Sequence, residues 1–193
     1  LVLTVGVSKD TRDDFFFPTR GSTASITLEA TVPGSDYEYY KLNLQGTHYL
    51  PMSKFLTLKA GLGLGVGEGH GDSEQLPFFK NYFAGGPRSV RGYNSRSLGP
   101  KDSGTTPEPT GGDTRVLINA ELLFPSFGDG NSLDKRVGFF IDSGMVWGPQ
   151  EDVDLGDLRY SAGIFFNWYS AVGPFSVSYG VPIDEEPDDD TEE

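Results

Sequence analysis

A chain of 193 residues is long enough for one domain or a large part of one. The formal net charge of −13 argues against a nucleic-acid partner, because nucleic-acid binding requires a cationic surface. The absence of cysteine excludes a structural disulfide and a thiol nucleophile. No stretch approaches the roughly 20 apolar residues of a membrane helix. The sequence is strand-like from its first residue and has no signal peptide, so we expect it to begin inside a larger protein.

Period-two alternation predicts about eight β-strands. The first is at residues 1–8, and the clearest is at 22–32, where Ala24, Ile26 and Leu28 face one way and Thr23 and Ser25 the other. Pro33-Gly34 then indicates a turn. The same alternation predicts further strands at residues 40–50, 56–67, 115–122, 136–145, 160–168 and 175–181.

Three features favour a transmembrane β-barrel over a soluble β-sandwich. The strands are expected to be about 9–11 residues long, the length that a tilted strand needs to cross a bilayer. Aromatic residues gather near strand ends, as in the girdles at a membrane–water interface; they are at 15–17, 37–40, 147 and 168–169. Short connections at 33–36, 51–54 and 171–174 alternate with long ones at 9–20, 68–113 and 149–157, which predicts turns on one side and loops on the other.

The connection from Glu68 to Asp113 is too long for a turn, and long ordered loops are usually functional. Its centre reads Val90-Arg91-Gly92-Tyr93, preceded by Phe-Ala-Gly-Gly at 83–86 and followed by Leu-Gly-Pro at 98–100. This ordered set resembles the sixth extracellular loop of the BamA family, which folds back into the barrel lumen. Phe-Phe-Pro-Thr-Arg-Gly at 16–21 and Glu-Leu-Leu-Phe-Pro at 121–125 resemble the same family.

The resemblance covers essentially the whole chain and implies an all-β, antiparallel outer-membrane barrel, here a fragment from its C-terminal part spanning 1–193. It implies a protein that folds and inserts client β-barrel proteins, with the outer-membrane bilayer, client barrels and BAM-complex lipoproteins as partners. Two alternatives remain: a translocation-assembly or two-partner-secretion transporter of the same superfamily, and a soluble β-sandwich binding module. The family's POTRA domains, first barrel strands and last, aromatic-ended strand are not in this sequence.

The loop motif is the predicted site. Strand parity places Glu121 on the polar face of its strand and Asp142 on the polar face of the next, so both are expected to point into the lumen and pair with Arg91. The resemblance implies the same contact. A guanidinium suits this role because its planar fork can bind two carboxylate oxygens at once. Gly92 fits a close backbone approach, and Tyr93 can fill lumenal space.

We predict no catalytic, metal or cofactor site. The only histidines, His48 and His70, are 22 positions apart in different segments, which is typical of polar surface rather than of a metal or base site. The alternating glycines from Gly61 to Gly67 are expected to face the lumen and make room for the loop. The acidic runs around Asp13, Glu151 and Glu185 are expected to be solvated and dispensable, including the tail at 184–193.

Overall fold

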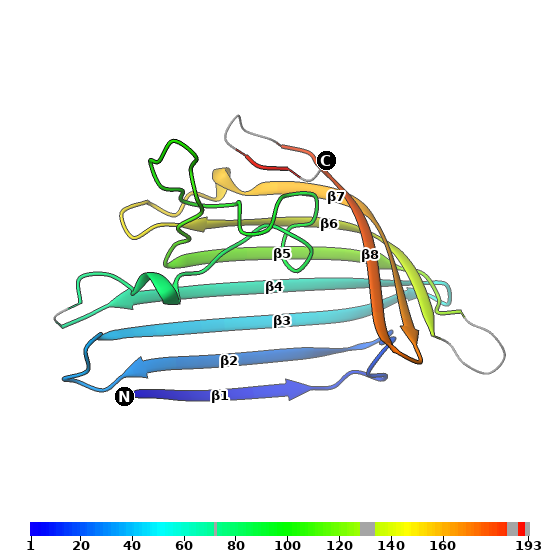
Figure 1. The fold of residues 1–193 in the computed structure, drawn as a ribbon. Helices are drawn as coiled ribbons and strands as arrows, with labels where there is room; N and C mark the ends of the chain where they lie inside the picture. The colour runs from blue at the N-terminus through cyan, green and yellow to red at the C-terminus, as the bar shows by residue number, and fades with distance from the viewer. Residues whose placement is uncertain (72, 128–133, 185–188, 192–193) are drawn as a thin grey trace.

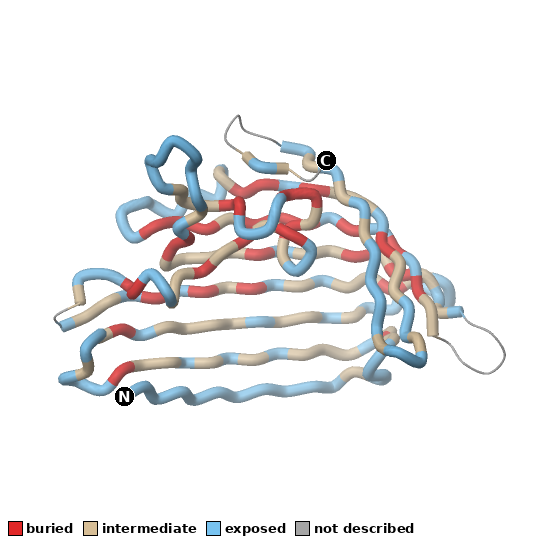
Figure 2. Tube along the Cα trace, viewed as in Figure 1, coloured by how far each residue is buried: buried red, intermediate tan, exposed pale blue. Residues whose placement is uncertain are grey.

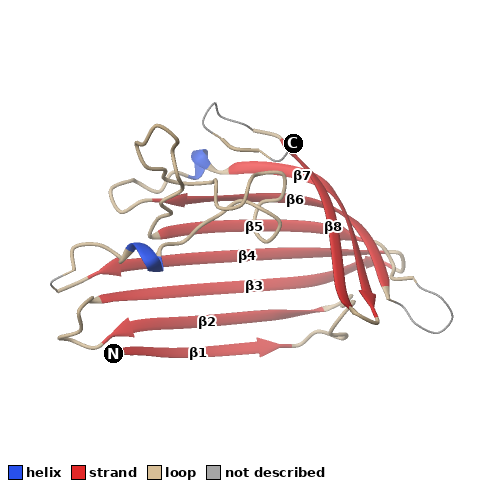
Figure 3. Ribbon diagram, in the orientation of Figure 1, coloured by secondary structure: helices blue, strands red, loops and turns tan. Residues whose placement is uncertain are grey.

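The computed structural model describes residues 1–71, 73–127, 134–184 and 189–191, which form one antiparallel sheet of eight strands in sequence order (Figure 1). The strands are β1 (Val2–Asp10), β2 (Gly21–Thr31), β3 (Tyr39–Ser53), β4 (Leu56–Gly69), β5 (Thr114–Leu123), β6 (Lys135–Trp147), β7 (Arg159–Ser170) and β8 (Gly173–Pro182). Two short 3-10 helices, η1 (Phe78–Lys80) and η2 (Leu155–Asp157), lie in the connections (Figure 3). The predicted all-β fold is confirmed. The β-sandwich alternative is wrong, because the strands in the described part of the chain make one sheet rather than two packed layers.

The sheet is curved and open. β1 and β8 each pair with one neighbour, and the far ends of β7 and β8 curve round towards the segment that follows β1 (Figure 1). The loop between β4 and β5 lies over the concave side, where buried residues gather (Figure 2). No helix in the described residues is long and apolar enough to cross a membrane.

The faces of this sheet are reversed relative to a soluble protein. The apolar positions of the strands point outward from the convex side and remain exposed, for example Ile26 at 51%, Phe139 at 52% and Ile164 at 53%. The polar positions point to the concave side, where Asp142 and Ser161 are completely buried. A continuous exposed apolar face of this kind needs an apolar surrounding, and the lipid-facing wall of a barrel has this pattern.

Strand parity corrects the predicted grouping of connections. Because every neighbouring pair is antiparallel, 32–38, 70–113 and 148–158 lie at one end of the sheet, which we call the loop end. The segments 11–20, 54–55, 124–134 and 171–172 join strands at the opposite end, the turn end. The long connection before Gly21 is therefore at the same end of the sheet as the two-residue turns. The prediction that short turns lie at one end and long loops at the other is wrong. The expected length of about 9–11 residues holds for β1, β2, β5 and β8, whereas β3, β4, β6 and β7 have 12–15 residues.

Two of the aromatic residues assigned to an interfacial girdle are buried instead of exposed. Tyr39 and Trp147 are each only 2% exposed. The Tyr39 hydroxyl donates to Glu29 at 2.6 Å, and the Trp147 indole nitrogen donates to Asp157 at 3.1 Å. The polar atom of each buried ring therefore donates to a carboxylate of the protein instead of meeting the water at a membrane interface.

The outward apolar face generates a first prediction, at Ile118 in the middle of β5, which is 44% exposed. Ile118→Arg in the natural protein that contains this chain should lower the free energy of unfolding in lipid vesicles by about 2–4 kcal/mol, because lipid cannot solvate the cation. Thr105→Arg, at an exposed loop position, is the control and should have little effect. Equal, near-zero changes for both variants, measured by denaturant titration, would show that β5 does not face lipid.

Candidate functional site

The connection 70–113 folds back against the concave face instead of extending into solvent. Its residues Val90 and Tyr93 have no exposed surface, and Leu98 is 1% exposed. They form one buried cluster with Leu117 of β5 and Val146 of β6. Since β4 continues to Gly69, this connection is two residues shorter at its start than predicted, and we call 70–113 the inserted loop.

Glycines of β4 provide the space for the inserted loop. A Cβ atom at Gly65 would lie 2.5 Å from the Tyr82 ring, and one at Gly67 would lie 2.8 Å from the Leu76 side chain. Gly61 differs, because a Cβ there would make only an ordinary 3.5 Å contact with Asn119. The expectation that lumenal glycines make room for the loop therefore holds for Gly65 and Gly67.

Arg91 lies between two strands and binds an acid on each. Its Nε donates to Asp142 Oδ2 at 2.6 Å, and its Nη2 donates to Asp142 Oδ1 at 2.8 Å and to Glu121 Oε1 at 3.0 Å. The guanidinium carbon is 3.6 Å from the centre of the Phe140 ring. Lys59 of β4 binds the other oxygen of Glu121 at 3.0 Å. These two cations and two anions make a cluster with no net charge.

Burial alone would lower the pKa of Arg91, but hydrogen bonds and charge from Asp142 and Glu121 outweigh it and raise the pKa. The guanidinium therefore remains charged. Asn119 supports the same carboxylate, donating to Asp142 Oδ1 at 2.9 Å and to the Ser89 carbonyl oxygen at 2.9 Å. The loop backbone is thus fixed next to the ion pair as well as by it.

Gly92 and Tyr93 connect the same loop to the other side of the curved sheet. Gly92 has a φ of +91°, and a Cβ there would lie 3.0 Å from the backbone of Gly180 in β8. The Tyr93 hydroxyl donates to the Asp184 carbonyl oxygen at 2.6 Å. The motif is therefore enclosed, with Arg91 against β5 and β6 and Gly92 against β8.

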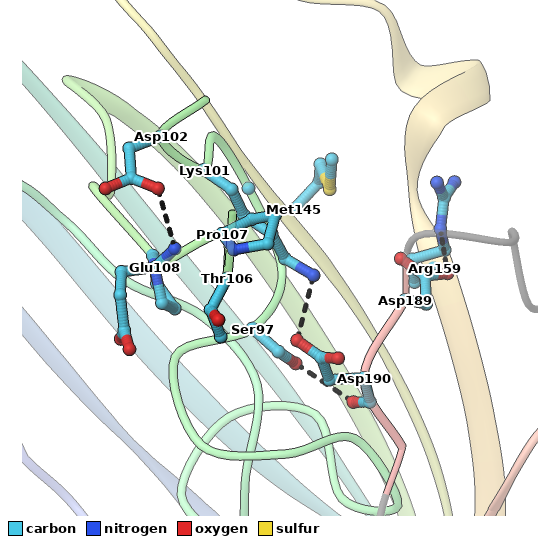
Figure 4. A pocket seen from close by; sticks show the side chains of 12 residues that line it. Ser97, Lys101, Asp102, Thr106, Pro107, Glu108, Met145, Arg159, Asp189 and Asp190 are labelled. Carbon is cyan, nitrogen blue, oxygen red and sulfur yellow. Dashed lines mark hydrogen bonds and ion pairs between the residues drawn. The ribbon is translucent and has the colours of Figure 1, made fainter. Parts of the chain in front are cut away.

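The prediction that the acidic tail is solvated is wrong for Asp189, which is nearly buried in an ion pair. It holds for the side chain of Asp184, which is exposed, while Asp190 is 55% exposed but also ion-paired. Asp189 binds Arg159 at 2.7 Å, with side chains 10% and 7% exposed, and Asp190 binds Lys101 of the inserted loop at 2.9 Å (Figure 4). The Asp190 carbonyl oxygen also accepts from the Asn94 backbone nitrogen at 2.8 Å. The tail lines a cavity together with residues 97–109 of the loop. Glu185 lies outside the described residues.

The sequence reasoning missed four participants in this site. They are Lys59, Asn119 and the inward rings of Phe140 and Phe165, and the second ring centre is 5.7 Å from the Arg91 guanidinium carbon. A signal was present for the two rings, because each breaks the alternation by adding an apolar residue to a polar face. Lys59 could have been found from strand register, since it pairs directly with Glu121 across β4 and β5.

The chain is similar to known proteins over nearly its whole length. The model of the Omp85 superfamily domain matches residues 1–193. The chain is 34% identical over 213 residues to outer membrane protein assembly factor BamA of Neisseria meningitidis serogroup B, covering 97% of this chain and 27% of that protein. It is 29% identical to BamA of Nitratidesulfovibrio vulgaris, covering 95% of this chain and 23% of the relative, so the chain spans about a quarter of the length of these relatives.

Two further similarities are to a protein of a yeast and to a solved crystal structure. A SAM50-like protein of Schizosaccharomyces pombe is 26% identical over 94% of this chain and 40% of its own length. The crystal structure of Haemophilus ducreyi BamA lacking POTRA domains 1–3 superposes with a TM-score of 0.89 at 30% identity, covering 99% of this chain and 40% of that one.

The glycine contacts generate a second prediction. Gly65→Ala should lower the free energy of unfolding by about 1–3 kcal/mol, because the new methyl group overlaps the buried Tyr82 ring. Gly61→Ala makes the same chemical change on the same face of β4 and should be close to neutral. Denaturant titration of both variants checks this. A cost at Gly61 equal to that at Gly65 would indicate a general intolerance of β4 rather than contact with the loop.

The tail contacts generate a third prediction. Asp189→Ala should expose residues 93–101 to proteinase K more rapidly, because it removes the carboxylate that binds the nearly buried Arg159. Asp184→Ala is a matched control with the same loss of charge, because the Asp184 side chain is exposed and its carbonyl oxygen, the acceptor for Tyr93, is retained. Identical digestion rates in the two variants would show that the ion pair of Asp189 with Arg159 does not help to hold the tail against the loop.

Proposed function

The chain belongs to the Omp85 superfamily, and on that basis we propose that it is part of the wall of an outer-membrane β-barrel that helps assemble other β-barrel proteins. The role is non-enzymatic. The wall supplies an apolar outer face to lipid and a polar inner face to the inserted loop, and Arg91 holds that loop in place.

One observation supports this proposal most strongly: the motif arginine is bound in the interior by acids from two adjacent strands. Asp142 has no exposed surface, so water cannot solvate its carboxylate. The stability of that buried charge therefore depends on the hydrogen bonds from Arg91 and Asn119. The loop is 44 residues by its bounds of 70 and 113, and a segment of that length loses much conformational entropy when it is ordered. A buried, bidentate ion pair is an interaction strong enough to offset part of that cost.

The proposed location is the outer membrane, and the proposed partners are membrane lipid, client β-barrel proteins and the lipoproteins of the BAM complex. The exposed apolar face supports the lipid contact. The similarity to two BamA proteins over more than nine-tenths of this chain supports assembly of client barrels rather than secretion. The lipoproteins are proposed on the resemblance alone.

A fourth prediction tests the proposed anchor in the natural protein that contains this chain. Arg91→Ala should expose the inserted loop to proteinase K and impair insertion of a client β-barrel into phospholipid vesicles. The physical reason is that removing one partner of a buried pair leaves the carboxylates uncompensated, at a cost of roughly 3–5 kcal/mol. Arg91→Lys should rescue only in part, because an ammonium group lacks the planar fork.

Arg88→Ala is the matched control, since Arg88 is an exposed arginine three positions earlier in the same loop. It should leave both loop protection and client insertion unchanged. The proposal fails if Arg91→Ala behaves like Arg88→Ala in both measurements.

A further inference from the structure

The Phe-Phe-Pro-Thr-Arg-Gly motif at 16–21 lies in a connection that is longer than its position requires. At the same turn end of the sheet, the β3–β4 and β7–β8 hairpins turn within two residues, at 54–55 and 171–172. The β1–β2 connection, 11–20, joins strands that are paired in the same antiparallel way. A tight turn would therefore suffice to join β1 to β2, and the additional residues need another explanation.

The connection 11–20 has a defined shape that its own acids maintain. The Asp13 carboxylate accepts from the Thr19 backbone nitrogen at 2.9 Å, the Thr19 hydroxyl at 2.6 Å and the Arg20 backbone nitrogen at 3.1 Å. Asp14 accepts from the backbone nitrogens of Phe16 and Phe17 at 2.8 and 2.7 Å. Partial burial would raise the pKa of Asp13, but the bonds from Thr19 and Arg20 lower it to about 2, so this acceptor is ionised at neutral pH.

This shaped connection reaches strands far away in the sheet order. Arg136 of β6 is 4% exposed, and its Nη1 and Nη2 donate to the carbonyl oxygens of Pro18 at 2.9 Å and Phe17 at 3.0 Å. The rings of Phe16 and Phe17 pack edge-on against Tyr169 of β7, with centre distances of 4.4 and 5.4 Å. Since three strands separate β2 from β6, these contacts cross the concave side of the sheet.

β6 is the support for this contact and for the inserted loop. Arg136, Phe140 and Asp142 share the concave face of the strand. Arg136 and Asp142 are six residues apart, which is about 20 Å along a strand. The inserted loop thus reaches Asp142 from the loop end, the connection 11–20 reaches Arg136 from the turn end, and the buried Phe140 ring lies between them.

We propose that the connection 11–20 is a latch that crosses the turn end of the lumen and closes it by docking its Phe17 and Pro18 carbonyls on Arg136. Arg136 is a positioning residue, which acts by holding the latch. The latch rests on the proposed barrel wall, because a lumen is needed for it to close. Its test does not measure client insertion, so the latch and the proposed assembly role can fail separately.

The docked position can be measured by cross-linking in a chain that has no cysteine of its own. Phe16→Cys and Tyr169→Cys are introduced together into the natural protein that contains this chain, and a short bis-maleimide is applied in the membrane. We expect efficient cross-linking in this background. Adding Arg136→Ala should reduce the yield about tenfold, because two hydrogen bonds to a charged donor are lost. Asp13→Ala, a substitution in the exposed connection that does not alter the wall, should reduce it as well.

Arg20→Ala is the control, because it keeps the backbone nitrogen that donates to Asp13. It removes only a 74% exposed guanidinium whose ion pair with Asp13, at 3.9 Å, contributes little. It should leave the yield unchanged. Conductance in planar bilayers tests whether the latch closes the lumen, since a contact that only stabilised the fold would leave conductance unchanged. Arg136→Ala and Asp13→Ala should raise the conductance, and Arg20→Ala should not. The latch is overturned if Arg136→Ala and Asp13→Ala leave cross-linking at the control level, or if they release the cross-link without raising conductance.

Discussion

A guanidinium buried beside two carboxylates is stable only when all three charges keep their partners, and Arg91, Glu121 and Asp142 meet that condition inside the curved sheet. Lys59 completes the cluster of two positive and two negative charges, whose side chains are between 0% and 28% exposed. This requirement also constrains the strands around the ions. β5 and β6 must be adjacent to place the two acids, and Gly65 of β4 must lack a side chain so that the loop can approach.

The reversed faces of the sheet explain why its interior contains segments of the chain rather than a conventional core. With the apolar side turned outward, the concave side presents polar groups that must find hydrogen-bond partners. The inserted loop binds Asp142 towards one end, and the connection 11–20 accepts two hydrogen bonds from Arg136 towards the other. Between them Phe140 and Phe165 pack with Leu123, which places a small apolar cluster within the polar interior. β6 contributes Asp142, Phe140 and Arg136 to these three sets of contacts.

Local rules were sufficient for much of this fold. Side-chain parity predicted the strands and placed Glu121 and Asp142 on the inner face. In the observed register Glu121 pairs with Phe140 and Asp142 pairs with Asn119, so the two acids are diagonal neighbours. Parity could not predict that Tyr39 and Trp147 are buried, because an aromatic residue at a strand end suits a lipid interface or a nearby carboxylate of the protein equally well. Parity also could not predict the ion pair of Asp189 with Arg159, since Asp189 lies in the tail after β8, where no strand alternation defines the path of the chain.

The central claim is that Arg91 and Asp142 stabilise the docked loop through each other, and a double-mutant cycle measures that directly. The free energy of loop docking is obtained from proteolysis rates for Arg91→Ala, Asp142→Ala and the double variant. The account predicts that the double variant costs less than the sum of the two single variants, by about 1–3 kcal/mol, because the second substitution removes the charge that the first left unpaired. Additivity within about 0.3–0.5 kcal/mol would contradict it, and would mean that the two residues stabilise the loop independently.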